Sequence, residues 1–292
     1  MKAEAVAADT WFVQGESAIG TPGNQNFISN AGFVITPAGV LVVDALGSPA
    51  LAERLLALIR AHTSAPLRYV VVTHCHADHI YGLQALKAAG ARIIAHTACR
   101  EYLASDTARL RLQASRTELF PWIDQNTQLT GADQWLGEGG DAADLVLTLG
   151  ARRFRVRHAG PAHTAEDLIV FDEQTHVLFA GDIVFRGRIP FVGQADSGRW
   201  IQALDLVLKL EPRLVVPGHG PVSTDPARDL KLTRDYLVFL REVMGQAARD
   251  MEPFDEAYAR IDWSRFADVP LFAAANRMNA YNTYLLMEHE AR

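Results

Sequence analysis

The sequence has few cysteines, no long apolar run and no excess of positive charge. Its two cysteines, Cys75 and Cys99, are too few for a disulfide framework. Cys75 is expected to be a packed free thiol, and Cys99 a core or surface thiol on a helix. No apolar segment reaches the roughly 18 residues of a membrane-spanning helix, so no membrane partner is expected. Lys and Arg number 28 against 34 Asp and Glu. This balance argues against a nucleic-acid partner, because phosphate binding needs clustered basic residues.

What is present is the composition of a globular protein, with 49% hydrophobic and 21% charged residues in a chain of 292. The N-terminus lacks the apolar core of a signal peptide, although an alanine-rich start such as residues 3–8 can also remain after a signal is removed. We therefore expect a cytoplasmic protein, with the periplasm as the alternative compartment.

Strand and helix patterns alternate through most of the chain. The predicted elements are a hairpin over 33–44, helices over 48–60, 82–89 and 197–210, and strands over 68–73, 91–95, 144–149, 154–158, 168–171, 177–180 and 213–216. Residues from about 97 to 143 read as an insertion of helix and irregular loop. The chain beyond 226 reads as mostly helical. We predict one α/β unit over residues 1–225 and a helical C-terminal extension, 226–292, packed on the same domain.

Histidines are concentrated in the run His74-Cys75-His76-Ala77-Asp78-His79, directly after a predicted strand. Imidazole and carboxylate ligands together suit zinc and other first-row metals. Four such ligands in one tight turn cannot easily reach a single ion. The spacing therefore favours two ions, with His74 and His76 on one and Asp78 and His79 on the other. In an extended chain Cys75 would point to the opposite face, so it is expected to pack rather than bind.

Three later residues occupy similar positions at the ends of predicted strands. They are His163 in GPAHT, Asp182 in AGD and His219 in PGHG. Each has Gly or Pro beside it, which allows the backbone to turn sharply and present the side chain at the rim of a sheet. Loops gathered at one edge of a rigid scaffold are the usual setting of an enzyme site. We expect these residues to join the histidine run.

The motifs HCHADH, GPAHT, AGD and PGHG, in this order, resemble those of the metallo-β-lactamase-fold superfamily of metallohydrolases, over about residues 10–222. The resemblance implies an α+β fold, a four-layer αββα sandwich of two mixed β-sheets with outer helices. It also implies two divalent ions, zinc by expectation, with iron or manganese as alternatives. The implied ligands are His74, His76 and His163 for the first ion, Asp78, His79 and His219 for the second, and Asp182 for both.

The resemblance further implies hydrolysis by a hydroxide held between the two ions, which Asp78 would orient. We expect an ester, thioester, lactone or cyclic amide of a small molecule as substrate. Asp182 disfavours the antibiotic-hydrolysing lactamases, which commonly have Cys or Ser there, and His76 disfavours flavin-partnered diiron reductases, which typically have Glu. A true β-lactamase and a mononuclear iron dioxygenase acting on a sulfur compound are kept as alternatives.

Three further residues are candidates for substrate binding. Arg186 and Arg188 follow Asp182 in a short loop and could hold a substrate carboxylate in a bidentate fork. Trp122, in the insertion, could line a lid over the metals. The alternative interpretations are solvated loop charges for the arginines and an aromatic anchor between insertion and core for Trp122.

Overall fold

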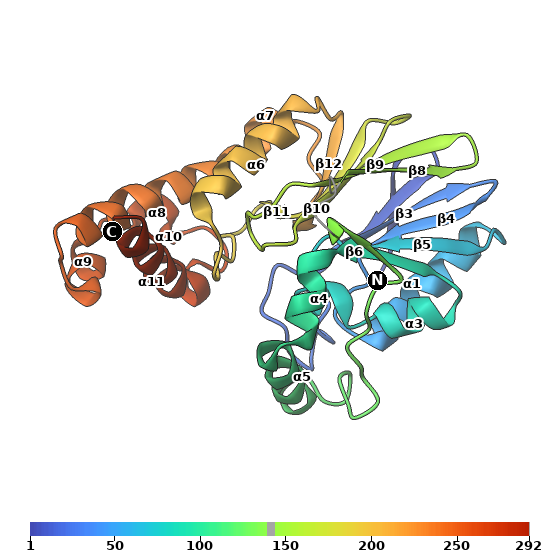
Figure 1. Ribbon diagram of the computed structural model, residues 1–292, viewed down its shortest axis with the longest axis horizontal. Helices are drawn as coiled ribbons and strands as arrows, with labels where there is room; N and C mark the ends of the chain where they lie inside the picture. Colours follow the sequence, from blue (N-terminus) through green and yellow to red (C-terminus); the bar gives the residue numbers. More distant parts are fainter. Residues whose placement is uncertain (139–143, 292) are drawn as a thin grey trace.

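Two mixed β-sheets lie face to face, with helices on the outer side of each (Figure 1). The computed structural model describes residues 1–138 and 144–291. The first sheet has the order β1 (Ala3–Ala7), β2 (Thr10–Val13), β3 (Ala31–Thr36), β4 (Gly39–Val43), β5 (Leu67–Val71), β6 (Arg92–His96) and β7 (Gln134–Leu136). Pairing is antiparallel from β1 to β4 and parallel from β4 to β7.

The second sheet has five strands, and it too is mixed. Its order is β12 (Leu214–His219), β11 (Val177–Phe185), β10 (Leu168–Asp172), β9 (Arg152–His158) and β8 (Asp144–Leu149). β12 and β11 run parallel, and the remaining pairs are antiparallel. The apolar runs predicted as strands from residue 144 onward are therefore strands of a single sheet.

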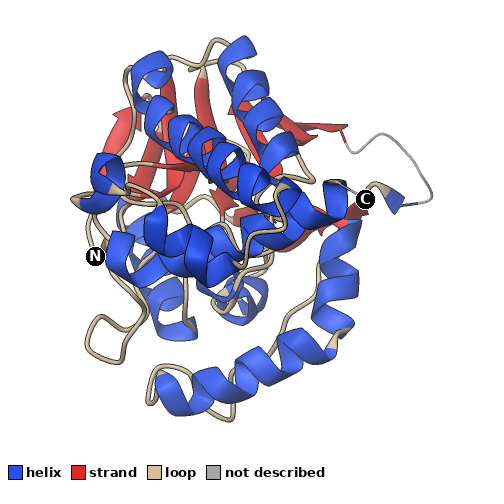
Figure 2. Cartoon of the chain, turned by 90° about the vertical axis from the view of Figure 1, so that its left-hand side faces the viewer, coloured by secondary structure: helices blue, strands red, loops and turns tan. Residues whose placement is uncertain are grey.

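Three apolar clusters define the layers of the sandwich. Between the sheets, Leu41 and Val71 of the first sheet share a cluster with Phe154 and Val170 of the second. The outer face of the first sheet packs against α1 (Pro49–His62), α3 (Leu83–Ala88) and α5 (Asp106–Glu118), and that of the second against α6 (Ser197–Lys209) and α8 (Lys231–Arg249). Figure 2 shows helices in front of the strands. The predicted four-layer αββα sandwich is confirmed.

Local sequence signals explain where α1 begins and which face it buries. The side-chain oxygen of Ser48 accepts the N–H of Leu51 at 3.3 Å, and Pro49 occupies the first turn, where no N–H is needed. Leu51, Leu55 and Ile59 recur at helical spacing and are buried against the sheet. The helix predicted over 48–60 is present with this start.

The insertion is more regular than the sequence indicated. It contains two helices, α4 (Thr97–Ala104) and α5, where one was predicted, and β7 adds to the first sheet beside β6 where an irregular loop was expected. β7 has only three residues, and its hydrogen bonds to β6 stabilise it more than its own composition does. Residues 139–143, the end of the predicted insertion, lie outside the described residues.

The chain after residue 225 is helical, as predicted. Its helices are α7 (Pro226–Asp229), α8, α9 (Phe254–Arg260), α10 (Ser264–Ala267) and α11 (Phe272–Glu290), and α8 to α11 lie to one side of the sandwich in Figure 1. Leu237 of α8 and Ala280 of α11 belong to the same apolar cluster as Leu204 of α6. A domain boundary at 225 stays a prediction. No helix within the described residues is long and apolar enough to cross a membrane.

Candidate metal centre

The seven predicted ligands lie together at one edge of the sandwich. His74 and His76 lie in the loop between β5 and α2 (Ala77–Ile80), Asp78 and His79 lie in α2, His163 lies between β9 and β10, Asp182 lies in β11 and His219 ends β12. Two placements differ in detail from the prediction. Asp182 and His219 were expected in turns after strands, but β11 continues through an irregularity to Phe185 and β12 continues to His219.

Two glycines allow β11 and β12 to carry these ligands so close together. Gly181 has a φ of +51°, and a Cβ there would lie 2.6 Å from Cβ of Thr73. A Cβ on Gly218 would lie 1.9 Å from Oδ1 of Asp182 and 2.7 Å from the carbonyl carbon of Gly181. The Gly residues beside Asp182 and His219 therefore provide space as well as a turn.

The first group of ligands surrounds a single point. Nδ1 of His76 lies 3.1 Å from Nε2 of His74 and 3.0 Å from Nε2 of His163. Oδ2 of Asp182 lies 3.7 Å from His74 Nε2 and 3.3 Å from His163 Nε2. Tetrahedral zinc with bonds of about 2.0–2.1 Å would separate its ligand nitrogens by about 3.3 Å. These four donors therefore fit one such ion.

The second group faces the same carboxylate from the other side. Oδ2 of Asp78 lies 3.3 Å from Nε2 of His219 and 3.6 Å from Nε2 of His79. Oδ1 of Asp182 lies 3.3 Å from His79 Nε2, and its Oδ2 lies 3.3 Å from His219 Nε2. Within the described residues, His79 Nε2 and Asp182 Oδ1 are buried and have no hydrogen-bond partner. Buried polar atoms are rarely left so, and a cation between them would satisfy both.

Burial and neighbouring charges give His163, His74 and Asp78 the protonation states that metal binding needs. Burial lowers the pKa of His163 to about 3, even though Asp182 opposes the shift, and burial with His79 lowers the pKa of His74. Both imidazoles are therefore neutral, the form that binds metals. Burial raises the pKa of Asp78, but His79 and His219 lower it more, so this carboxylate is ionised.

Asp44 orients His79 and was given no role from the sequence. Its Oδ2 accepts Nδ1–H of His79 at 2.9 Å and the hydroxyl of Thr73 at 2.8 Å, and its Oδ1 accepts the Thr73 N–H at 2.8 Å. The bond at Nδ1 leaves Nε2 of His79 free to face the second group. Asp44 directly follows β4, the parallel neighbour of β5, and parallel strands end at the same edge. That position was the available signal.

The segment 28–30 supports three parts of the site, and like Asp44 it was not predicted from the sequence. The carbonyl of Ile28 accepts Nδ1–H of His219 at 2.7 Å. The Ser29 hydroxyl donates to the carbonyl of Asp78 at 2.5 Å, and the Asn30 amide donates to the carbonyls of Pro217 and Gly220 at 2.8 Å each. No sequence motif distinguishes this segment. Ser29 and Asn30 form these hydrogen bonds with common polar side chains, and Ile28 forms its bond with the backbone carbonyl.

Aromatic rings enclose the ligands on the side of the second sheet. The ring of Phe185 is stacked on His219 at 5.0 Å with an interplanar angle of 5°, and the centroid of buried Trp200 lies 5.0 Å from that of His163. Phe191 is half-buried, with its ring 6.2 Å from that of His76. These rings exclude water from one side of the ligand groups.

The three candidates for substrate binding lie in different surroundings. Arg188 is 7% exposed as a whole residue, its guanidinium lies over the ring of Phe185, and its Nη1 lies 3.4 Å from Nδ1 of His219. The Arg186 side chain instead pairs with Asp229 at 2.9 Å and donates to a backbone carbonyl. Nε1 of Trp122 donates to the Pro22 carbonyl at 2.8 Å. Only the side chain of Arg188, among these three, lies against a ligand in the described structure.

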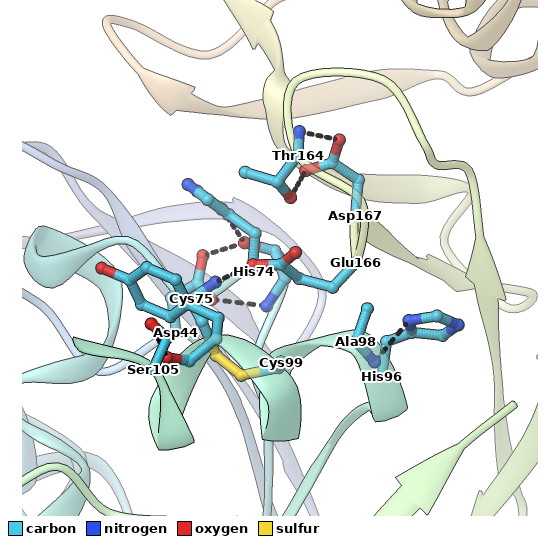
Figure 3. The surroundings of a disulfide bond; sticks show 12 residues. Asp44, His74, Cys75, His96, Ala98, Cys99, Ser105, Thr164, Glu166 and Asp167 are labelled. Carbon is cyan, nitrogen blue, oxygen red and sulfur yellow. Dashed lines mark hydrogen bonds between the residues drawn. A yellow bond between two sulfur atoms is a disulfide. The ribbon is translucent and has the colours of Figure 1, made fainter. Parts of the chain in front are cut away.

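The two cysteines form a disulfide, so the prediction of free thiols was wrong (Figure 3). Cys75 packs into the apolar cluster on the outer face of the first sheet and is in neither ligand group, as predicted. α4 folds back over this cluster and brings the Cα of Cys99 to 5.8 Å from that of Cys75, a normal disulfide spacing. The two cysteines are 24 positions apart, and no local pattern in the sequence predicts that they approach each other.

Comparison with known proteins places these features in one family. Residues 25–219 match the model of the metallo-beta-lactamase superfamily. A metallo-beta-lactamase type 2 of Bacillus cereus is 26% identical over 200 residues, which are 67% of this chain and 68% of that protein. A hydroxyacylglutathione hydrolase of Bdellovibrio bacteriovorus is 29% identical over 153 residues, 51% of this chain and 47% of that protein. A solved sec-alkylsulfatase from Pseudomonas sp. superposes with a TM-score of 0.74 at 16% identity, covering 97% of this chain and 50% of that one. The family match spans most of the chain and contains all seven candidate ligands, and the chain belongs to the metallo-beta-lactamase superfamily.

Proposed function

We propose that this protein is a two-metal hydrolase that cleaves an ester, thioester, lactone or cyclic amide of a small molecule. The observation that carries the proposal is the position of Asp182. Its Oδ2 lies 3.3 Å from Nε2 of His163 in the first ligand group, and its Oδ1 lies 3.3 Å from Nε2 of His79 in the second. Oδ2 also lies 3.3 Å from Nε2 of His219 in the second group. A carboxylate whose oxygens reach both groups is suited to bind two ions at once.

The remaining ligands divide between the two ions. The first ion would be held by His74, His76 and His163, and the second by Asp78, His79 and His219. A donor set of imidazoles and carboxylates suits zinc, with iron or manganese as alternatives. When bound, such ions supply a water of lowered pKa and a Lewis acid. Asp78 stays ionised and would orient the attacking water by accepting its hydrogen bond.

We also propose that Arg188 binds an anionic group of the substrate. The guanidinium is buried beside His219, and within the described residues no carboxylate pairs with it. Its contact with His219 Nδ1 is no hydrogen bond, because that nitrogen already donates to Ile28. A buried cation with no carboxylate in direct contact is costly even with the charges of Asp182 and Asp78 nearby, and an arriving carboxylate or sulfate would compensate it.

Metal content and a substrate panel test the hydrolase. We expect two zinc equivalents per chain and turnover of at least one ester, thioester, lactone, β-lactam or alkyl sulfate. Asp182→Asn should lower both zinc content and turnover, whereas His289→Ala, an exposed histidine of α11, should change neither. One iron equivalent with oxygen consumption would instead support the dioxygenase alternative. Full turnover by Asp182→Asn would refute the two-metal assignment.

Arg188 is tested by comparing anionic and neutral forms of a substrate found in that panel. Arg188→Met should raise KM for the anionic form about tenfold or more, the loss expected for a charge-assisted hydrogen bond, and leave the neutral form unaffected. Arg186→Met is the matched control, because Arg186 already pairs with Asp229. Equal KM changes for the anionic and neutral forms would show that Arg188 does not bind the anionic group of the substrate.

A further inference from the structure

The disulfide joins the ligand-bearing loop to the first helix of the insertion. Cys75 lies between His74 and His76, and Cys99 lies in α4 (Figure 3). Both cysteines are 1% exposed. Because a candidate ligand flanks Cys75 on each side, a movement of the Cys75 backbone would displace both imidazoles.

The same point of the loop is held from a second direction. The Cys75 N–H donates to Oε1 of Glu166 at 3.2 Å, and the Glu166 side chain is largely buried. Glu166 lies three residues after His163, in the loop that supplies the third ligand of the first group. The backbone at Cys75 is therefore fixed between α4 on one side and the His163 loop on the other.

The α4 end of this connection is anchored as well. Nδ1 of His96 accepts the Ala98 N–H at 3.2 Å and caps α4, and its ring is stacked on that of His158 at 3.9 Å with an interplanar angle of 9°. Nε2 of His158 donates to the carbonyl of Ala165 at 2.8 Å. α4 is thus linked to the same loop that carries His163. Through the disulfide and α4, the loop that carries His74 and His76 is therefore also linked to the loop that carries His163.

We propose that the Cys75–Cys99 disulfide is a clamp that positions His74 and His76 for the first ion. The inference rests on the proposed function, because it takes these histidines as metal ligands. The bond forms when two thiols lose two protons and two electrons to a small-molecule disulfide, which leaves as two thiols. Such bonds persist in oxidising compartments. The clamp therefore favours the periplasm over the cytoplasm.

Zinc affinity with and without the bond tests the clamp. The wild type is oxidised with glutathione disulfide, and zinc binding is measured by competition with a chromophoric chelator. It is compared with the double variant Cys75→Ser/Cys99→Ser. Loss of groups that orient metal ligands typically weakens binding about 10–100-fold, so the double variant should bind the first zinc at least about tenfold more weakly. Met244→Ala is the control for a general loss of stability, because Met244 of α8 is buried in the apolar cluster on the outer face of the second sheet.

A second measurement avoids reliance on the double variant. A water-soluble phosphine reduces the bond in the wild type, giving two thiols and phosphine oxide with oxygen taken from water, and zinc affinity should fall by the same factor. The double variant should not respond to the phosphine.

Four results would overturn the clamp. Equal zinc affinity with and without the bond is one, and an equal loss in Met244→Ala is another. A third is recovery of both cysteines as alkylatable thiols from oxidised, unfolded wild type. Absence of any zinc from the wild type would overturn the two-metal hydrolase and the clamp with it, whereas the first three leave the hydrolase intact.

Discussion

Replacing Asp44 with Asn should weaken the site of the second ion without unfolding the protein. The Asp44 carboxylate accepts three hydrogen bonds, from His79 Nδ1 at 2.9 Å and from the Thr73 hydroxyl and N–H at 2.8 Å each. Asn has the same shape and tolerates the left-handed φ of +63° at this position. The change therefore replaces one acceptor by a donor and leaves packing and backbone as they are.

The orientation of the new amide determines what is lost. If the amide nitrogen of the new side chain faced the Thr73 N–H, two hydrogen-bond donors would face each other, and neither group can act as an acceptor. If it faces His79, the imidazole can respond by carrying its proton on Nε2, the atom that would bind the metal. The second orientation is therefore favoured, and it opposes metal binding. Removing a group that orients a metal ligand costs about 10–100-fold in affinity, which corresponds to about 1.4–2.7 kcal/mol.

Stepwise zinc affinities, measured by chelator competition, check this prediction. The zinc equivalent held by His79 should bind about 10–100-fold more weakly in Asp44→Asn. The other should weaken less, because Asp44 reaches His74 only through the Thr73 hydroxyl, which lies 3.1 Å from His74 Nδ1. Asp172→Asn is the matched control, because Asp172 is also a buried carboxylate, but it pairs with Arg152 at the far end of β10. It should lower stability and leave both zinc sites unchanged. Two unaltered zinc sites in folded Asp44→Asn would refute the role of Asp44 in setting the His79 tautomer.

Three further predictions concern the close packing at Gly218, the pH dependence of stability through His96, and the disulfide. Gly218→Ala should displace Asp182, since the new Cβ would lie 1.9 Å from Oδ1, and zinc analysis should find fewer than two equivalents; a fully loaded variant would contradict this. Burial, and to a smaller extent the neighbouring imidazole of His158, lowers the pKa of His96 to about 4. As the pH falls from about 6.5 to 4, His96 is protonated in the unfolded chain before it is protonated in the folded protein, so the free energy of unfolding decreases. His96→Asn keeps a capping oxygen but has no titrating group. The free energy of unfolding in urea should therefore fall less in His96→Asn than in the wild type between about pH 6.5 and 4. The same pH dependence in both proteins would count against this role of His96. Serine at Cys75 and Cys99, separated by 24 positions, should lower the free energy of unfolding by about 3.5 kcal/mol, and an unchanged urea midpoint would exclude a stabilising bond.

The sequence predicted the parts of the fold whose signals are local. The short apolar runs within residues 33–44 flank a Pro-Ala-Gly turn and form most of β3 and β4, and Ser48 followed by Pro49 begins α1. β1, β2 and β7 were not predicted. They have three to five residues each, and β1 and β7 lie at the sheet edges, so they owe their regularity to a neighbouring strand rather than to their own sequence.

The candidate ligands could be found because each lies in a short motif of unusual composition. Their supports could not be found in this way. Asp44 and Ile28 act across many intervening residues, through a carboxylate and a backbone carbonyl that no local pattern distinguishes. The same limit applies to Arg186 and Arg188, which looked equivalent in the sequence. The partner that separates them is Asp229, more than forty residues away.

The supports also show that the two ions should be separable by mutation. The first ligand group is held mainly through Cys75, by its disulfide and its bond to Glu166, whereas the second is held through Asp44 and Ile28. Asp44 reaches the first group only indirectly, through the Thr73 hydroxyl beside His74. A change to one set of supports should therefore weaken mainly one ion. Asp182 faces both groups, so a change that moves it should weaken both. Loss of both ions after removing a single support would mean that the disturbance had reached Asp182, and Gly218→Ala provides the reference for that outcome.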